Sequence, residues 1–262
     1  MLKRRLIPKL LLRPGKVGGR ERMVLVTTIK YDKTIEVGDP VSQAKIYEAQ
    51  AVDELIFLDI AATPETRPLT LDVIRKAAAE TFMPVTVGGG VKSVEDFRLW
   101  LSNGADKIAI NTAAVEEPDL IPRASDRFGA QCVVVSIDCR GDAERGWTVW
   151  TRNGSRDTGL DPAAWAAEAQ RRGAGEILIS AIDRDGSSQG LDLALTKSVT
   201  DAVTIPVIAS GGCGLAAHFI AGFRDAEADA VSAGTFFCFK DQNPMQTRSH
   251  IRNAGIPVRL HQ

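Results

Sequence analysis

The chain has 262 residues, of which 44% are hydrophobic and 25% are charged, and its formal net charge is −1. This composition is typical of a soluble globular protein, and the lack of a basic excess argues against a nucleic-acid partner. No stretch approaches the roughly 20 apolar residues of a membrane span, and Pro8 and Lys9 interrupt the apolar N-terminus. We therefore expect a cytoplasmic protein without a membrane anchor or signal peptide.

The four cysteines lack CxxC spacing and lie in or beside apolar segments, and the chain has only three histidines. This pattern predicts buried free thiols and no metal site, and nothing in it calls for a cofactor.

Apolar runs rich in Val, Ile and Leu recur along the chain, and they are nearly continuous, as in strands buried on both faces. We expect strands at 6–12, 55–60, 85–87, 107–110, 133–137, 177–182, 207–209 and 228–233. Segments with helical spacing lie at 40–51, 70–80, 94–102, 118–128, 161–172, 192–203, 215–222 and 244–253. Eight strands alternating with eight helices predict an α/β fold, a single (β/α)8 TIM barrel over residues 1–262. A doubly wound open sheet is the second possibility.

Helix-start signals support this pattern. Asp39 and Asp161 each precede a proline, which gives an N-cap followed by proline at the first helical position. Ser93 has Asp96 three residues later, the spacing of a capping box.

The two halves of the sequence repeat each other. "VDELIFLDIAAT" is echoed by "AGEILISAIDRDG", which places Asp59 and Asp183 124 positions apart. "ADKIAINTAA" is echoed by "ADAVSAGTFF", and "VTVGGG" by "VIASGG", at nearly the same separation. This constant spacing predicts two half-barrels of four strand–helix units each, at about 1–128 and 129–262.

Glycines follow the third and seventh predicted strands, on the face of a barrel that holds active sites. Glycine lets the backbone approach an anion and present its N–H groups, and a threonine follows the neighbouring strand in each half. The pattern predicts two phosphate cradles, and hence a ligand with a phosphate at each end. The predicted ligand-binding residues are Gly89, Gly90, Asn111, Thr112, Ser180, Asp185, Gly186, Ser210, Gly211, Gly212, Gly234 and Thr235.

Asp138 ends the fifth predicted strand, where a carboxylate can act as a general acid or base. A structural ion pair or a loop cap is the alternative for Asp138, and also for Asp59 at the end of the second strand. In the half-barrel register the counterpart of Asp138 is Leu11, which cannot exchange a proton. A symmetrical pair of carboxylates would therefore be half missing.

The motifs "FLDI", "VTVGGGV", "GADKIAINTAAVE", "VVVSID" and "IPVIASGG" resemble the cyclase subunit of imidazole glycerol phosphate synthase. The resemblance covers essentially the whole chain. It implies a barrel that pairs with a glutaminase at the amino ends of its strands and conducts ammonia through its core. The ammonia then attacks a bisphosphorylated ribonucleotide, which yields imidazole glycerol phosphate. The base-type aspartate of the family matches Asp138, and its two phosphate sites match the two cradles.

The sequence departs from the family pattern at two catalytic positions. Leu11 stands where the family has a second catalytic aspartate, and Gly19 stands where its flexible loop contributes a lysine. We therefore expect very weak or absent cyclase turnover.

The charged gate at the ammonia entrance is also implied by the resemblance. Arg5, Lys107 and Glu176 match it, whereas Ala49 is placed where a glutamate is expected.

The "LLL" strand and the "TTIKYDKTIEVGDP" loop look like a paralogous branch associated with surface-sugar (lipopolysaccharide-type) amidation. That branch implies a glutaminase in a heterodimer, a phosphorylated small-molecule ligand and a sugar amidotransferase as partners. Three functions stay open: a synthase subunit in sugar amidation, the cyclase of histidine biosynthesis, and a non-catalytic scaffold that activates the glutaminase and conducts ammonia.

Overall fold

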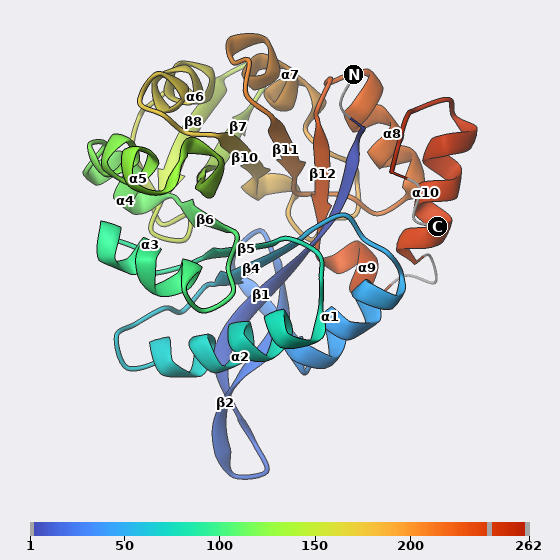
Figure 1. Cartoon of the computed structure of the whole chain (residues 1–262). Helices are drawn as coiled ribbons and strands as arrows, with labels where there is room; N and C mark the ends of the chain where they lie inside the picture. The colour runs from blue at the N-terminus through green and yellow to red at the C-terminus, as the bar shows by residue number, and fades with distance from the viewer. Residues whose placement is uncertain (1–2, 240–242, 260–262) are drawn as a thin grey trace.

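The computed structural model describes residues 3–239 and 243–259, in which eight parallel strands close into a barrel surrounded by helices (Figure 1). The ring is closed because the first barrel strand pairs with the last, the fourth with the fifth and the fifth with the sixth. This confirms the predicted (β/α)8 barrel over the open sheet. In ring order the strands are β1 (Arg5–Val17), β4 (Leu55–Asp59), β5 (Val85–Gly88), β6 (Lys107–Ile110), β7 (Val133–Asp142), β10 (Glu176–Ala181), β11 (Val207–Ser210) and β12 (Ala230–Ala233).

The helices lie between the strands along the chain and cover the outside of the barrel (Figure 1). All eight predicted helices are present. The helices are α1 (Pro40–Ala49), α2 (Arg67–Glu80), α3 (Val94–Leu101), α4 (Thr112–Glu116), α5 (Leu120–Phe128), α6 (Pro162–Arg171), α7 (Leu193–Ala202), α8 (Ala216–Arg224), α9 (Thr235–Phe239) and α10 (Pro244–Asn253), with 3-10 turns η1 (Ala130–Cys132) and η2 (Ile182–Arg184).

The predicted helix starts are confirmed in their hydrogen bonds. The side chains of Asp39 and Asp161 accept from backbone N–H groups three residues later, at the starts of α1 and α6. Ser93 and Asp96 form the expected capping box on α3. Each cap satisfies N–H groups that the first helical turn leaves without partners.

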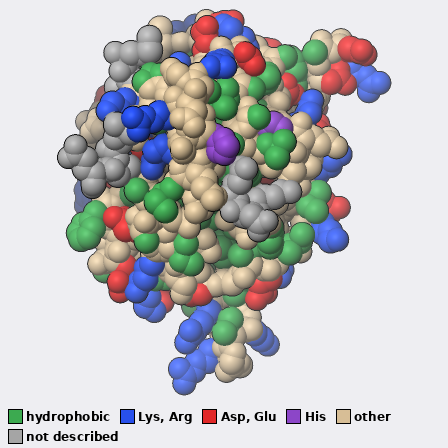
Figure 2. All heavy atoms as spheres, turned by 90° about the vertical axis from the view of Figure 1, so that its right-hand side faces the viewer, with side chains coloured by type: hydrophobic (Ala, Val, Ile, Leu, Met, Phe, Trp, Pro, Cys, Tyr) green, Lys and Arg blue, Asp and Glu red, His purple; other side chains and the backbone are tan. Residues whose placement is uncertain are grey.

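Two antiparallel extensions at the carboxyl ends of the strands were not predicted. β1 runs on past the barrel and pairs with β2 (Arg20–Ile29), which pairs with β3 (Lys33–Gly38). The connecting turn uses Gly18 and Gly19, both with positive φ, as a two-residue hairpin requires. β7 extends likewise into β8 (Gly146–Thr151) and β9 (Arg156–Asp157). The first hairpin projects from the body and carries exposed Lys and Arg side chains near its tip (Figure 2).

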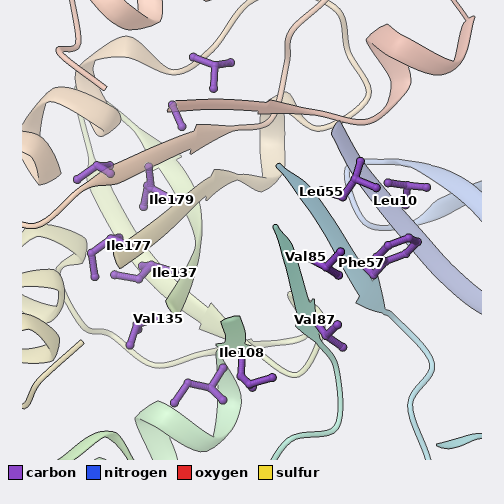
Figure 3. Packing of buried hydrophobic residues seen from close by; sticks show 14 of the residues in the cluster. Leu10, Leu55, Phe57, Val85, Val87, Ile108, Val135, Ile137, Ile177 and Ile179 are labelled. Atoms are coloured by element: carbon purple, nitrogen blue, oxygen red, sulfur yellow. The ribbon is translucent and has the colours of Figure 1, made fainter. Parts of the chain in front are cut away.

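The strands bury apolar side chains on both faces. Outward-facing residues such as Phe57, Val87, Ile137 and Ile179 belong to the large core between the strands and the helices (Figure 3). A second, smaller cluster fills the inside of the barrel, and we call it the apolar layer. Its members are Ile7, Ile56, Ala109, Val134, Leu178, Ile208 and Ala230.

No helix in the described part of the chain is both long and apolar enough to cross a membrane. The four cysteines are free thiols, with Cys139 and Cys213 buried and Cys132 and Cys238 half-buried.

Candidate active site at the carboxyl ends of the strands

A cavity of about 800 Å³ opens at the carboxyl ends of the barrel strands, which we call the mouth. Gly89, Gly90, Asn111 and Thr112 line it together with Asp138, so this first cavity brings together the first predicted cradle and the predicted acid–base residue. Its volume is within the range of small-molecule sites.

Backbone geometry explains the glycines of the first cradle. Gly89 has a φ of +107°, and a Cβ there would lie 2.3 Å from the carbonyl oxygen of Asp59. Gly90 has a φ of +66°. The backbone conformation therefore requires glycine at these positions, and the close approach of an anion would require it as well.

A second cavity at the mouth contains the second predicted cradle. Ser210, Gly211, Gly212, Gly234 and Thr235 line it, together with Asp185 and Gly186. Gly212 has a φ of +105°, which again favours glycine.

The two cavities share part of their lining. Leu11 and Thr28 border both of them, so the two predicted cradles flank β1 at Leu11, where this strand passes the mouth. Ser180 is buried at the end of β10, where it pairs in register with Asp138, and it is not among the residues that line either cavity.

Asp138 is half-buried in the first cavity and is held by two side chains. The hydroxyl of Tyr31 donates to its Oδ1 at 3.0 Å, and Nδ2 of Asn111 donates to its Oδ2 at 3.1 Å. Burial raises the pKa of Asp138 to about 6, and the nearby charge of Lys9 and the bond from Tyr31 limit this rise. A carboxyl group with a pKa near 6 can serve as a base at neutral pH and return the proton easily.

The other strand-end aspartates have structural partners. Asp59 accepts from the hydroxyl of Thr70 at 2.7 Å and from the N–H of Ala61 at 3.0 Å, and burial raises its pKa. Asp183 accepts from Arg140 and from the N–H of Gly141. These contacts fit the loop-cap alternative for Asp59, and they give Asp183 a structural role in the neighbouring loop.

A ring of alternating charges closes the barrel at the amino ends of its strands. Arg5 donates to Glu54 at 2.7 Å and to Glu176 at 2.6 Å, and Lys107 donates to the same glutamates at 2.9 and 2.8 Å. We call these four residues the charged ring. Burial opposes the charge on Glu54, but Arg5 and Lys107 outweigh it and lower its pKa.

The prediction that Ala49 occupies the fourth gate position is wrong. Ala49 is the last residue of α1, whereas Glu54, five residues later, completes the ring. The predicted gate residues Arg5, Lys107 and Glu176 thus lie together in one ring, in which two carboxylates pair with two cations.

Comparison with known proteins identifies the family. A family model described as "Histidine biosynthesis protein" matches residues 5–243. The chain belongs to this family. A protein of Prochlorococcus marinus (strain MIT 9313), named as a candidate imidazole glycerol phosphate synthase subunit hisF2, is 48% identical over 264 residues that cover 100% of both chains. The imidazole glycerol phosphate synthase subunit HisF of Caulobacter vibrioides (strain NA1000 / CB15N) is 48% identical over 261 residues, which are 99% of this chain and 97% of that protein.

Two residues at the mouth of this histidine biosynthesis family member were not predicted from the sequence. Tyr31 lies in the β2–β3 turn with a φ of +61°, and its hydroxyl reaches Asp138. Lys9 is buried on β1, and its Nζ donates to Oγ of Ser210 at 2.9 Å. A lysine inside an otherwise apolar strand was the available signal for Lys9, since such a residue is rarely buried without a polar purpose.

Gly19 lies at the exposed tip of the first hairpin. Its left-handed backbone, with a φ of +78°, makes the tight turn between β1 and β2, and it brings no cation to the mouth.

We expect Glu54→Gln to lower the free energy of unfolding by about 3 kcal/mol, because removing one partner of a buried ion pair leaves the others uncompensated. The side chains of Glu54 and Arg5 are only 6% and 11% exposed. Urea denaturation at pH 7 measures the loss. Glu36→Gln is the matched control, because Glu36 forms an exposed ion pair with Arg13 and should change stability by less than about 0.5 kcal/mol. Equal effects of the two variants would contradict a structural role for the ring.

Proposed function

We propose that the chain is the cyclase subunit of an imidazole glycerol phosphate synthase, in which ammonia from a glutaminase reacts with a bisphosphorylated ribonucleotide at the mouth. The observation that carries the proposal is the pair of cavities, each with a glycine-lined cradle, on either side of Leu11 on β1, with Asp138 in the first of them. Relatives that match nearly the whole chain have names that place them in this synthase.

In this proposal the cradles bind the two terminal phosphates and hold the reacting centre between them. Asp138 takes up and returns protons there, because its pKa of about 6 keeps it mostly ionised at neutral pH. Tyr31 holds the carboxylate in place; burial raises the pKa of its phenol, so this group stays protonated and acts as a donor.

The glutaminase would dock at the opposite end, on the face around the charged ring. Ammonia released there would cross the apolar layer as the neutral molecule, since an ion pays a far larger desolvation cost. Titrating the chain with a cognate glutaminase should give a one-to-one complex and faster glutamine hydrolysis.

One observation favours a second candidate function. Leu11 leaves β1 without a carboxylate between the two cradles, which suits a subunit that activates the glutaminase and passes ammonia to a different acceptor, such as a surface sugar held by an amidotransferase. The names of the relatives lend this candidate no support. We therefore put the cyclase first.

The deciding experiment measures imidazole glycerol phosphate formation from the ribonucleotide with ammonium salts at alkaline pH, without a glutaminase. We expect slow but measurable turnover. Absence of product from both the unmodified protein and its Leu11→Asp variant would reject the cyclase. An increase in glutaminase activity on complex formation would then favour the second candidate.

A further inference from the structure

Lys9 is a buried cation that the proposed reaction does not use. Its side chain points into the barrel from β1, and the residue is only 6% exposed. Of its three N–H donors, one goes to Oγ of Ser210 at 2.9 Å. No carboxylate in the described part of the chain lies within ion-pair distance of the ammonium, although Asp138 is near enough for the charge of Lys9 to lower its pKa.

A buried ammonium without an ion-pair partner is costly, and proteins retain such groups where an anion arrives to pair with them. Lys9 lines the second cavity, the one that contains the second cradle. Among the described lining residues of that cavity it is the single basic side chain, and Asp185 is the single acidic one. Without Lys9 the cavity would therefore have a net negative lining, which is unsuited to a phosphate.

A second polar group in this cavity also lacks a partner. Ser232 is fully buried on β12, and no described group hydrogen-bonds to its Oγ. The cavity has a volume of about 20 Å³, which is enough for one water-sized group. A single phosphate oxygen fits that space, with Lys9 and Ser232 as donors beside it.

We propose that Lys9 is a phosphate-binding residue of the second cradle, which it reaches from inside the barrel, and that Ser232 assists it. One phosphate oxygen enters this cavity and accepts from the two free N–H groups of Lys9 and from the hydroxyl of Ser232. Ser210 holds the ammonium in place. The inference rests on the proposed function only in taking a phosphate ester as the ligand.

The test is direct binding of inorganic phosphate. Isothermal titration calorimetry measures the affinity, and diffraction from crystals soaked in phosphate shows which cradle is occupied. The unmodified protein should show phosphate at both cradles. Lys9→Met keeps the length of the side chain and removes its charge; it should weaken binding at the second cradle by about tenfold or more and leave the first cradle occupied. Lys92→Met is the control, because Lys92 is an exposed cation that lines only the first cavity of the two.

The two variants separate a specific contact from a loss of general positive charge. An affinity of Lys9→Met for phosphate at the second cradle within twofold of the unmodified protein would overturn the proposal, as would equal losses in both variants. If Lys9→Met fails to fold, the 15N signal of the Lys9 ammonium in the unmodified protein takes its place. That signal should move on addition of phosphate, and an unchanged signal with the second cradle occupied would refute the contact. Turnover is measured separately, so an inactive protein that still binds phosphate through Lys9 would reject only the cyclase.

Discussion

Leu11→Asp should raise imidazole glycerol phosphate formation with free ammonia by about tenfold or more. Leu11 borders both cavities and packs against Val24 and Val26, so a carboxylate there would face the space between the cradles. General acid–base groups contribute roughly 10²- to 10⁴-fold to a rate, and only part of this is regained when one group is restored to a site shaped by leucine.

The matched control for this variant is Leu11→Asn, which has nearly the same shape as aspartate but cannot exchange a proton. Both variants introduce a polar side chain against Val24 and Val26, so both should lose similar stability in thermal denaturation. A gain that appears only with aspartate assigns the effect to proton transfer. An equal gain with asparagine would assign it to polarity or to altered packing, and fast turnover of the unmodified protein would show that another group already performs the task.

Asp138→Asn should lower turnover by about 10²- to 10⁴-fold, because it removes the strand-end carboxylate whose pKa lies close to working pH. In the unmodified protein kcat/KM should rise with pH around the pKa of about 6, as Asp138 ionises. Asp183→Asn is the control, since Asp183 is a half-exposed aspartate on the next strand end that bonds a loop. A similar loss in the control would contradict a specific role for Asp138.

The same substitution should raise stability at neutral pH. The folded-state pKa of Asp138 is about 6 against an ordinary value of 3.8, so the folded protein binds more protons between these values and loses stability as pH rises through them. Asparagine removes this dependence. At pH 7.5 Asp138→Asn should be more stable by up to about 3 kcal/mol, an upper limit because water reaches the side chain through the mouth. Urea midpoints at pH 4 and 7.5 measure the difference, which should shrink at the lower pH.

The barrel was predictable because its strands are buried on both faces. Each strand therefore reads as a short, nearly continuous apolar run, and the prolines and aspartates mark where helices begin. The hairpin of β1 and β2 was not predictable in the same way. Its outer half, near Lys16 and Arg20, is polar and exposed, so it gives neither an apolar run nor a clean alternation. Pairing alone defines this outer half, whereas the buried apolar run from Met23 to Val26 in the inner half of β2 was a strand signal that the prediction overlooked.

The site was predicted unevenly for a similar reason. Glycines next to a strand end can be recognised in the sequence because of their conformational role. The structure places both predicted cradles at cavities. Glu54 was missed because a sequence position alone does not show which side chain points into the ring. The direction of the side chain depends on where the strand bends inward. Tyr31 was missed because it reaches Asp138 from a turn 107 positions away.

The apolar layer has a consequence for where protons can travel. Its seven side chains are at most 4% exposed and carry no hydrogen-bonding group, so they offer no partner to a chain of hydrogen-bonded water. Protons move quickly through proteins only along such chains or between titratable groups, and this layer contains neither. Each proton that Asp138 takes up or releases must therefore be exchanged with the solvent at the mouth. We therefore expect the protonation of Asp138 to follow the pH of the solution outside the mouth, and not proton transfer from the charged ring.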